Sequence, residues 1–497
     1  MSEAPKHGVQ RLHSFKDVAQ AVLHNIRHES QSEAHRLFRE QPGHQDLTSK
    51  QPAKHIVPGI EQPGSVGVVY VTERAAANGF KAGAKDWANF GQGAPETTDL
   101  EGGCPRPTVL DLSAFGDDIH EYGPTTGITE LRQKVADYYN HTFRQNKPKK
   151  IEAANIAIVP GGRAGLARIM SVLGPVLLGY SHLDYAAYEP LLGMSQVQGV
   201  PMQLEESKRF KVTAADLEAE VKARGLTTLL LSNPRNPTGQ IIEGQELKDV
   251  VDMSSRLDVT TIMDEFYSHY LLEGELGRSV SAMEYIDDIE ESNVVLVDGL
   301  TKNARLPGWR VCWVSGPRDL ISAIGAVGSY LDGGASHPMQ VFALPMLDLD
   351  RIAQDRLALQ KHFRMKRDHV LKRLAKMGLP VNVPPVATFY IWLDLKPLPP
   401  PLNSGLVFAE ELLKEKAIVT PGIFFDINPG HRRNIVDSPC ESYIRISFGP
   451  KLEELDRGLD AFERVLAKAA KGDTSLGTNY ARADPSTKHQ VTPQAHG

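Results

Sequence analysis

The sequence is poor in cysteine and has no long apolar run, and both absences restrict what the protein can be. Its three cysteines, Cys104, Cys312 and Cys440, lie far apart in 497 residues. This number and spacing provide neither a disulfide framework nor a metal-binding pattern, so we expect a reducing, cytoplasmic location. No apolar stretch reaches the roughly 20 residues that span a bilayer, and the N-terminus lacks the apolar core of a secretory signal.

Charge and composition exclude two further classes of partner. The formal net charge is −6, and the chain is 23% charged and 41% hydrophobic. A mildly acidic chain of this kind gives no reason to expect nucleic acid or an anionic membrane as a partner. Its length exceeds that of one compact core, so we predict two main domains.

The two ends of the chain differ from its middle. Apolar residues recur at helical spacing between Phe15 and Ile26, which predicts one amphipathic helix. His24 and His28 have a metal-ligand spacing, but no acid or cysteine completes a set, so a solvated helix face explains them better. From Lys471 onward the chain is polar and aperiodic, which is typical of a disordered tail.

Short apolar runs alternate with helical patterns through the middle of the chain, and this predicts an α/β fold with a largely parallel sheet. In such a sheet the carboxyl ends of the strands share one edge, where ligands bind. Candidate residues follow five of these runs. They are Gly162, Tyr185, Asn236, Asp264 and Lys302.

Lys302 lies in the stretch around which the site is organised, Val294–Pro317. An apolar run ends at Asp298-Gly299, Lys302 follows, and a loop through Pro307-Gly308 leads to Arg310. A primary amine at a strand end can form a Schiff base with an aldehyde cofactor once desolvation and nearby cations favour its neutral form. Taken alone, a surface lysine in a β-β connection explains the stretch equally well.

Other strings have the chemistry of anion or ring binding. Pro160-Gly161-Gly162-Arg163 separates a strand from a helix, and the helix amides and dipole there attract phosphate. Arg163 either pairs with that phosphate or points to solvent. Asp264 ends another strand, although a helix N-cap would also explain it. Arg445 lies alone in an apolar strand, where a charge is costly unless paired, either with a substrate or within the small domain.

Three longer motifs complete the pattern. The string Asn233–Gly239 reads N-P-x-N-P-T-G, which chance rarely produces. The string Asn89–Pro95 contains two glycines before a proline, which marks backbone open to close approach at Gly93. Tyr122 precedes a glycine-containing turn and an apolar-periodic helix. A plain turn and a packed tyrosine are the alternatives for the last two motifs.

Together these motifs make the chain resemble the pyridoxal-phosphate (PLP)-dependent aminotransferases of fold type I, class I/II, over about Gly91 to Ala467. The resemblance implies a seven-stranded-type, largely parallel sheet in a large PLP-binding domain, with a smaller α+β domain. The parts that we expect are an N-terminal extension (1–50), an arm and part of the small domain (51–104), the large domain (105–338), the small domain (339–470) and a disordered tail (471–497).

The resemblance also implies roles for the candidate residues. Lys302 would hold pyridoxal 5'-phosphate as an aldimine and act as general base, Asp264 would keep the ring nitrogen protonated, and Tyr267 and Asn236 would bond the ring oxygen. The remaining implied cofactor contacts are Gly162, Arg163 and Arg310 at the phosphate, Tyr185 stacked on the ring, and Tyr122 reaching the phosphate of the opposite subunit of a homodimer. The implied substrate contacts are Gly93, Asn236 and Arg445.

The implied activity is transfer of an amino group from an α-amino acid to a 2-oxo acid, without a metal. A PLP-dependent lyase or oxidase stays open, because Cα deprotonation is common to all three. A non-catalytic regulator is disfavoured, because residues 1–50 are too short and not basic enough for a DNA-binding domain. An aromatic or large hydrophobic substrate is weakly preferred. Its pocket would be lined by Tyr70, Phe80, Trp87, Phe425 and the loop at Arg432-Arg433.

One position departs from the family pattern. Relatives usually carry serine or threonine three residues before the lysine, as a phosphate ligand, whereas this chain has Gly299. Thr301 or Arg163 would then substitute for the missing hydroxyl.

Overall fold

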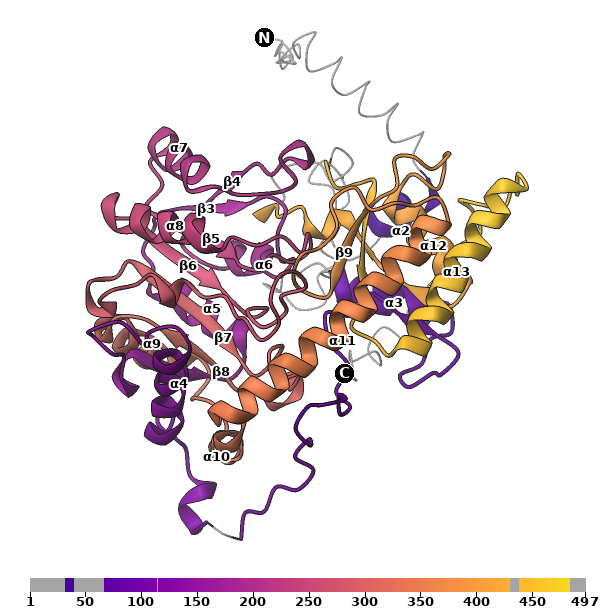
Figure 1. Cartoon of the computed structure of the whole chain (residues 1–497). Coiled ribbons are helices and arrows are strands. Elements are labelled where there is room, and N and C mark those ends of the chain that lie inside the picture. Colours follow the sequence, from indigo (N-terminus) through magenta and orange to yellow (C-terminus); the bar gives the residue numbers. More distant parts are fainter. Residues whose placement is uncertain (1–31, 40–66, 114, 430–437, 483–497) are drawn as a thin grey trace, which may run out of the picture.

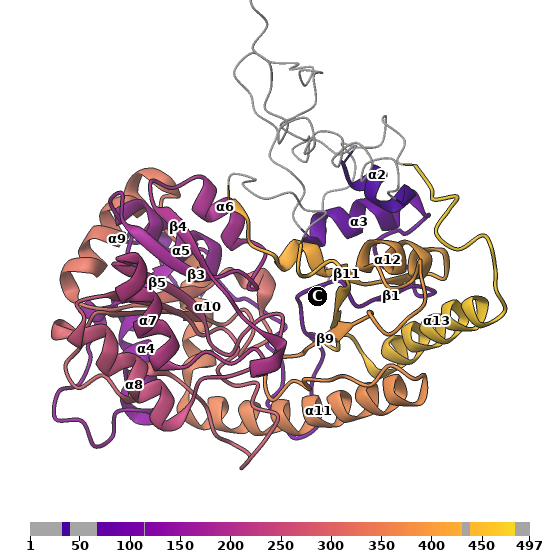
Figure 2. The ribbon, with the colours of Figure 1, turned by 90° about the horizontal axis from the view of Figure 1, so that it is seen from above.

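The computed structural model describes residues 32–39, 67–113, 115–429 and 438–482, and these form two lobes (Figure 1). Helix α11 (Leu349–Lys376) runs along both lobes, as the view from above also shows (Figure 2). The helix expected between Phe15 and Ile26 and the loop at Arg432-Arg433 lie outside the described residues. No helix in the described ranges is long and apolar enough to cross a membrane.

The large lobe is built on a seven-stranded sheet with the order β2-β8-β7-β6-β5-β3-β4. Strand β8 runs antiparallel to both neighbours, and the other neighbouring pairs are parallel. The predicted largely parallel α/β sheet is therefore confirmed. The strands are β2 (Ile156–Val159), β3 (Leu177–Ser181), β4 (Gln198–Met202), β5 (Thr228–Ser232), β6 (Thr260–Asp264), β7 (Val294–Gly299) and β8 (Cys312–Ser315).

Helices cover both faces of this sheet, which explains why its central strands are apolar throughout. In β7, Val295 and Val297 belong to the same core cluster as residues of α5 and α9, whereas Val294 and Leu296 belong to the cluster that contains residues of α4, α7 and α8. The helices of the lobe are α4 (Thr129–Thr142), α5 (Gly162–Val172), α6 (Tyr188–Gly193), α7 (Ala214–Arg224), α8 (Gly244–Arg256), α9 (Arg318–Leu331) and α10 (His337–Ala343).

The small lobe has an antiparallel sheet of order β11-β12-β9 and a two-stranded pair, β1 with β10. Its elements are α2 (Glu33–Arg39), α3 (Gly67–Ala77), β1 (Ala88–Asn89), β9 (Tyr390–Asp394), α12 (Gly405–Lys414), β10 (Ala417–Ile418), β11 (Thr420–Pro421), β12 (Tyr443–Ser447) and α13 (Leu452–Ala470). Short 3-10 helices are η1 (Asp117–His120), η2 (Ala153–Asn155), η3 (Glu206–Lys208), η4 (Ala282–Glu284), η5 (Ile289–Glu291), η6 (Pro307–Trp309), η7 (Leu344–Leu347) and η8 (Gly422–Phe425).

The structure corrects two of the expected boundaries, the start of the small domain and the start of the disordered tail. Elements α10 and η7 pack against α4 of the large lobe, so the predicted boundary at residue 339 is too early. The tail predicted to be disordered from residue 471 instead packs on the small lobe over residues 471–482. Tyr480 is only 6% exposed, and Arg74 donates to the Ala481 carbonyl at 2.7 Å. One aromatic side chain in a polar stretch is enough to anchor it in the core.

Candidate active site

The five candidates at strand ends lie along one edge of the sheet. They follow β2, β3, β5, β6 and β7, which all run in the same direction. Two of them, Lys302 and Asp264, follow the adjacent strands β7 and β6, and the charge of Lys302 is among the influences that lower the pKa of Asp264. The sheet thus brings together the amine and the acid expected at the two ends of a cofactor ring.

Lys302 occupies the turn after β7, and its Nζ donates a hydrogen bond to the carbonyl of Gly93. Burial, followed by the positive charges of Arg445 and Arg163, lowers the pKa of Lys302 to about 7. Much of the amine is therefore neutral near neutral pH, which is the form that can attack a carbonyl or accept a proton. The alternative of an ordinary surface lysine does not fit this environment.

Asp264 ends β6 and is 6% exposed. The Tyr188 hydroxyl donates to its Oδ2 at 2.8 Å, and the Phe266 amide lies 3.5 Å from Oδ1. Burial raises the pKa of Asp264 to about 6, although Tyr188, the Phe266 amide and Lys302 all lower it. The chain after Asp264 forms turns, so the helix N-cap alternative is wrong. Tyr188 went unrecognised in the sequence, where its spacing from Tyr185 was the one available signal.

A corner with the geometry expected of an anion site lies where β2 meets α5. Helix α5 begins at Gly162, and no side chain caps its N-terminus. The Arg310 guanidinium lies across Gly161, where a Cβ would be 1.7 Å from Nη2. Gly161 has a φ of 104°, and Arg310 a φ of 56°. Helix N-terminal amides without a side-chain cap, together with a guanidinium, suit a phosphate group.

The structure does not decide whether Arg163 pairs with a phosphate or points to solvent. Its side chain is exposed, and its Nε donates to the Tyr185 hydroxyl at 3.0 Å. Arg163 therefore orients the aromatic ring that is expected to stack on the cofactor. A phosphate contact by Arg163 stays a prediction.

Gly299 is explained by the neighbouring strand. It pairs with Cys312 across β7 and β8, and a Cβ at position 299 would lie 2.6 Å from both Cα and Sγ of Cys312. No side chain fits there without displacing β8. The Thr301 hydroxyl, one of the two expected substitutes, lies 3.1 Å from Cys312 Sγ.

Arg445 is a buried cation on the small-lobe side of the site. It is 2% exposed, and it donates to the Gly91 carbonyl at 2.9 Å and to Asn236 Oδ1 at 3.1 Å. Its Nε has no hydrogen-bond partner among the described residues. The guanidinium lies 4.3 Å from the ring centre of Tyr390 and 4.8 Å from that of Phe425. Neutral oxygens and rings surround this charge, which leaves it able to bind an anionic ligand.

Tyr390, on β9 of the small lobe, contacts a residue of the large lobe at the site. Its hydroxyl lies 2.7 Å from that of Tyr267, and a Cβ at Gly93 would come within 2.9 Å of it. Glycine at position 93 is therefore required by a close approach. The sequence assigned no role to Tyr390, because the partners of this residue come from distant parts of the chain.

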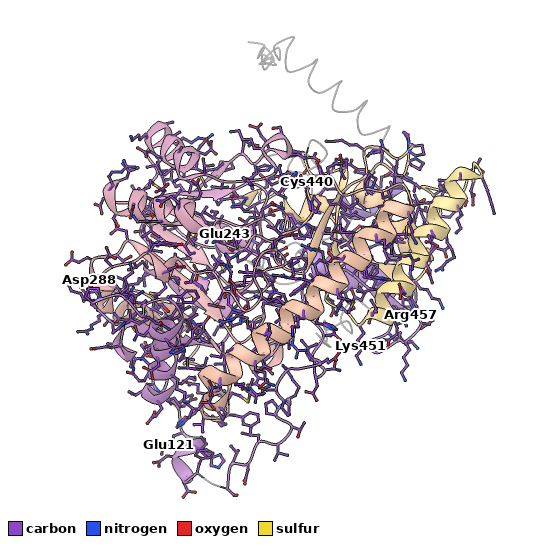
Figure 3. All side chains as sticks on the ribbon, in the orientation of Figure 1. Glu121, Glu243, Asp288, Cys440, Lys451 and Arg457 are labelled. Atoms are coloured by element: carbon purple, nitrogen blue, oxygen red, sulfur yellow. The ribbon has the colours of Figure 1, made fainter. Side chains whose placement is uncertain are left out.

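Tyr122 does not join the buried part of the site in its own chain, since it is 95% exposed. It follows η1 on a segment that projects from the large lobe, where the neighbouring Glu121 is labelled (Figure 3). Val109 and Phe115 on the same segment are 73% and 44% exposed.

Three residues expected to line a substrate pocket lie elsewhere. Tyr70 packs in the small-lobe core at 4.9 Å from Phe424, and Phe80 packs on Trp87 at 5.3 Å, ring centre to ring centre. Their aromatic character reflects core packing. Among the described members of the expected set, Phe425 is the one whose ring lies beside Arg445.

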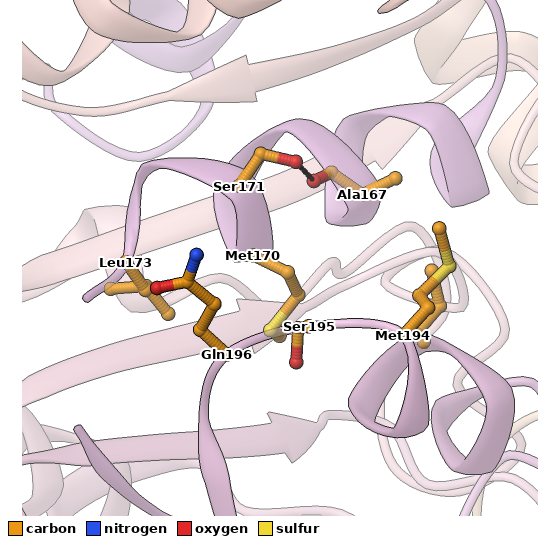
Figure 4. Close-up of a pocket in the computed structure, with 8 residues that line it drawn as sticks. Ala167, Met170, Ser171, Leu173, Met194, Ser195 and Gln196 are labelled. Carbon is orange, nitrogen blue, oxygen red and sulfur yellow. Dashed lines mark hydrogen bonds between the residues drawn. The ribbon is translucent and has the colours of Figure 1, made fainter. Parts of the chain in front are cut away.

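A separate surface pocket lies between α5 and the turn after α6 (Figure 4). Met170, Leu173, Leu191 and Met194 contribute its apolar lining. It shares no residue with the site and has no ionisable lining side chain, so it offers nothing to the chemistry.

Comparison with known proteins identifies the family. A model described as aminotransferase class I and II matches residues 85–462. The chain belongs to this aminotransferase family. It is 25% identical over 361 residues to aromatic-amino-acid aminotransferase 2 of Thermococcus litoralis, covering 71% of this chain and 86% of the relative. It is 26% identical over 404 residues to aspartate aminotransferase of Pyrococcus abyssi, covering 78% and 93%.

Solved structures share the fold of this aminotransferase. Aspartate aminotransferase of Thermus thermophilus with maleate superposes with a TM-score of 0.65 at 21% identity, covering 81% of this chain and 97% of that one. The protein is thus a PLP-dependent transaminase of fold type I. Its relatives support amino-group transfer and do not favour the lyase, oxidase or regulator alternatives.

Proposed function

We propose that this aminotransferase works at the strand-end site, with Lys302 as the residue that holds the cofactor and moves the proton. The observation that carries the proposal is the pairing of a lysine whose pKa falls to about 7 with a buried acid whose pKa rises to about 6. Opposed shifts of titratable groups gathered at one place are typical of acid–base sites. The substrates would be an α-amino acid and a 2-oxo acid.

The corner at Gly161 and Gly162 fits the phosphate of the cofactor, with Arg310 as its counter-ion. Asp264 fits a protonated ring nitrogen, because a cation at this point would stabilise its buried carboxylate. Bound pyridoxal phosphate supplies an electron sink beside the substrate Cα. Tyr185, held by Arg163, would cover one face of the ring.

Asn236 and Tyr267 would bind the ring oxygen. Arg445 donates to Oδ1 of Asn236, so the amide nitrogen of Asn236 remains to donate to that oxygen. The Tyr267 hydroxyl, close to that of Tyr390, is the second donor. This hydrogen-bond pattern determines the orientation of the Asn236 amide.

Arg445 and Gly93 would bind the substrate carboxylate. The unpaired Nε and the planar guanidinium of Arg445 suit a bidentate contact. Once the substrate is bound, Lys302 would take the Cα proton and return it one step later. The Tyr390 and Phe425 rings beside Arg445 favour an aromatic or large hydrophobic side chain, in line with the aromatic relative.

A homodimer would complete the site. Tyr122 is almost fully exposed on a segment with two further exposed apolar residues, Val109 and Phe115. Exposed apolar side chains on a projecting segment suit a partner surface, and a second subunit would place Tyr122 at the phosphate of the neighbouring site. Light scattering tests this, and a monomer at micromolar concentration would contradict it. We also place the enzyme in the cytoplasm, since its three cysteines are free.

Half-reactions with a panel of amino acids test the proposed function. We expect the purified protein to show the visible absorbance of bound cofactor, and the absorbance to change on addition of a substrate with release of a stoichiometric 2-oxo acid. Release of free ammonia instead would favour elimination or oxidation. No absorbance change with any amino acid would contradict the proposal.

A further inference from the structure

A buried ion cluster ties the Gly93 segment to helix α11. Glu96 Oε1 accepts hydrogen bonds from Lys366 Nζ at 2.7 Å and from His362 Nε2 at 2.5 Å. The Lys366 side chain is 0% exposed and that of Glu96 is 9% exposed. Burying such a pair costs free energy unless its geometry is well satisfied, so its presence beside the site calls for a specific role.

The same lysine contacts the exit of β12, the strand that carries Arg445. Lys366 Nζ donates to the Gly449 carbonyl at 3.0 Å, and the Glu96 amide donates to that same carbonyl at 2.9 Å. A Cβ at Gly449 would lie 2.3 Å from the Ala94 carbonyl. The two backbones therefore approach closely, and Lys366 links them by binding the Gly449 carbonyl and the Glu96 carboxylate.

The lysine loop holds the other side of this segment. Arg305 Nη1 donates to the carbonyls of Glu96 at 2.9 Å and Thr98 at 2.6 Å. Arg305 lies three residues after Lys302, whose own amine reaches the Gly93 carbonyl. Glu96 is thus the point at which α11, the exit of β12 and the Lys302 loop meet.

We propose that Glu96 and Lys366 are positioning residues, which hold Gly93 at a fixed distance from Arg445 and Lys302. The inference rests on the proposed function, in which Gly93 and Arg445 bind one substrate carboxylate. Two contacts to one small group require their separation to be held within a fraction of an ångström. Neither Glu96 nor Lys366 touches the substrate itself.

Electrostatics support a charged pair. Burial favours the neutral acid at Glu96, but hydrogen bonds from His362 and Lys366 together with the charge of Lys366 outweigh it and lower its pKa to about 2. The carboxylate is therefore ionised throughout the working range. Replacing it by an amide keeps the shape and removes the charge that holds Lys366.

The test measures binding of cofactor and of amino acid separately in E96Q and K366M. The spectral change on adding an amino acid gives its Kd, and titration of the apoenzyme with pyridoxal phosphate gives the cofactor Kd. We expect the amino-acid Kd to rise about 10- to 100-fold, with the cofactor Kd nearly unchanged. The milder E96D, which withdraws the carboxylate by one methylene, serves in place of any variant that does not fold.

The matched control is a second buried pair in the small lobe. Arg74 Nε lies 2.6 Å from Glu410 Oε1, with side chains 4% and 2% exposed. E410Q should lower the Tm as E96Q does but leave the amino-acid Kd unchanged. Equal effects of E96Q and E410Q on the amino-acid Kd would overturn the positioning role alone. A wild-type enzyme that responds to no amino acid would overturn the proposed function together with it.

Discussion

The two sides of the site are built in different ways. On the large-lobe side, Gly162, Asp264 and Lys302 are placed by the ends of parallel strands, so the backbone of the sheet sets their positions. On the small-lobe side, Gly93, Arg445 and Tyr390 are placed by contacts among buried side chains and closely approaching backbone. Substitutions on the first side should therefore remove chemistry and leave the geometry intact. Substitutions on the second side should change how well the substrate binds.

The strongest test of the large-lobe side is K302A. Loss of the amine should lower the rate of the amino-acid half-reaction by about 10²- to 10⁴-fold, because proton transfer at Cα then lacks its base. The far-UV circular dichroism and the Tm should stay near those of the wild type. Appreciable turnover by K302A would show that another group moves the proton and would break the comparison.

Arg445 tests the small-lobe side next. R445K keeps the charge and loses the planar fork, and it should cost about 2 to 5 kcal/mol of substrate binding, measured as a raised KM or a weaker amino-acid Kd. R445Q should in addition raise the pKa of Lys302, because Arg445 is one of the charges that lowers it. The basic shift of the pH–rate profile should appear in R445Q and not in R445K. The same shift in both variants would mean that Arg445 does not act through its charge.

The variant G299A tests how tightly β7 and β8 pack on the large-lobe side of the site. Its Cβ would meet Cys312 at 2.6 Å, so we expect the free energy of unfolding to fall by about 1 to 3 kcal/mol. C312G in the same chain removes the contacts with Sγ and Cβ but not with Cα, so it should restore part of the loss. If G299A has the free energy of unfolding of the wild type in a denaturant titration, β8 can shift to accommodate the added methyl group at little cost.

The contrast between the two sides also explains what the sequence could predict. Residues that follow apolar runs could be grouped from the order of the chain alone, because parallel strands bring their carboxyl ends to one edge. Asp264 and Lys302 were found in this way. Tyr390 and the Glu96–Lys366 pair could not be found, since contacts across as many as 270 residues leave no local pattern.

Two wrong predictions, the disorder of the tail and the lining of the substrate pocket, have the same cause. The polar, aperiodic sequence from Lys471 suggested disorder, but the Tyr480 ring is buried in the small-lobe core. Tyr70, Phe80 and Trp87 have the composition of a substrate pocket, yet Tyr70 and Trp87 are buried in the core and the partly buried Phe80 packs against it. Burial of an individual aromatic residue depends on tertiary neighbours that periodicity does not reveal.

The smallest predicted effect concerns Tyr188, which modifies Asp264 through one hydrogen bond. The Tyr188 hydroxyl lowers the pKa of Asp264, which burial has raised to about 6. Y188F should therefore raise that pKa further, by about 1 unit. Asp264 would then be protonated at a higher pH, so the acid limb of the pH–rate profile should move up by a similar amount while the rate above neutral pH changes little. Because the strand end fixes the carboxylate, the amino-acid Kd at high pH should match the wild type. An altered Kd with an unmoved acid limb would mean that Tyr188 acts by packing, and the backbone would not then suffice to position Asp264.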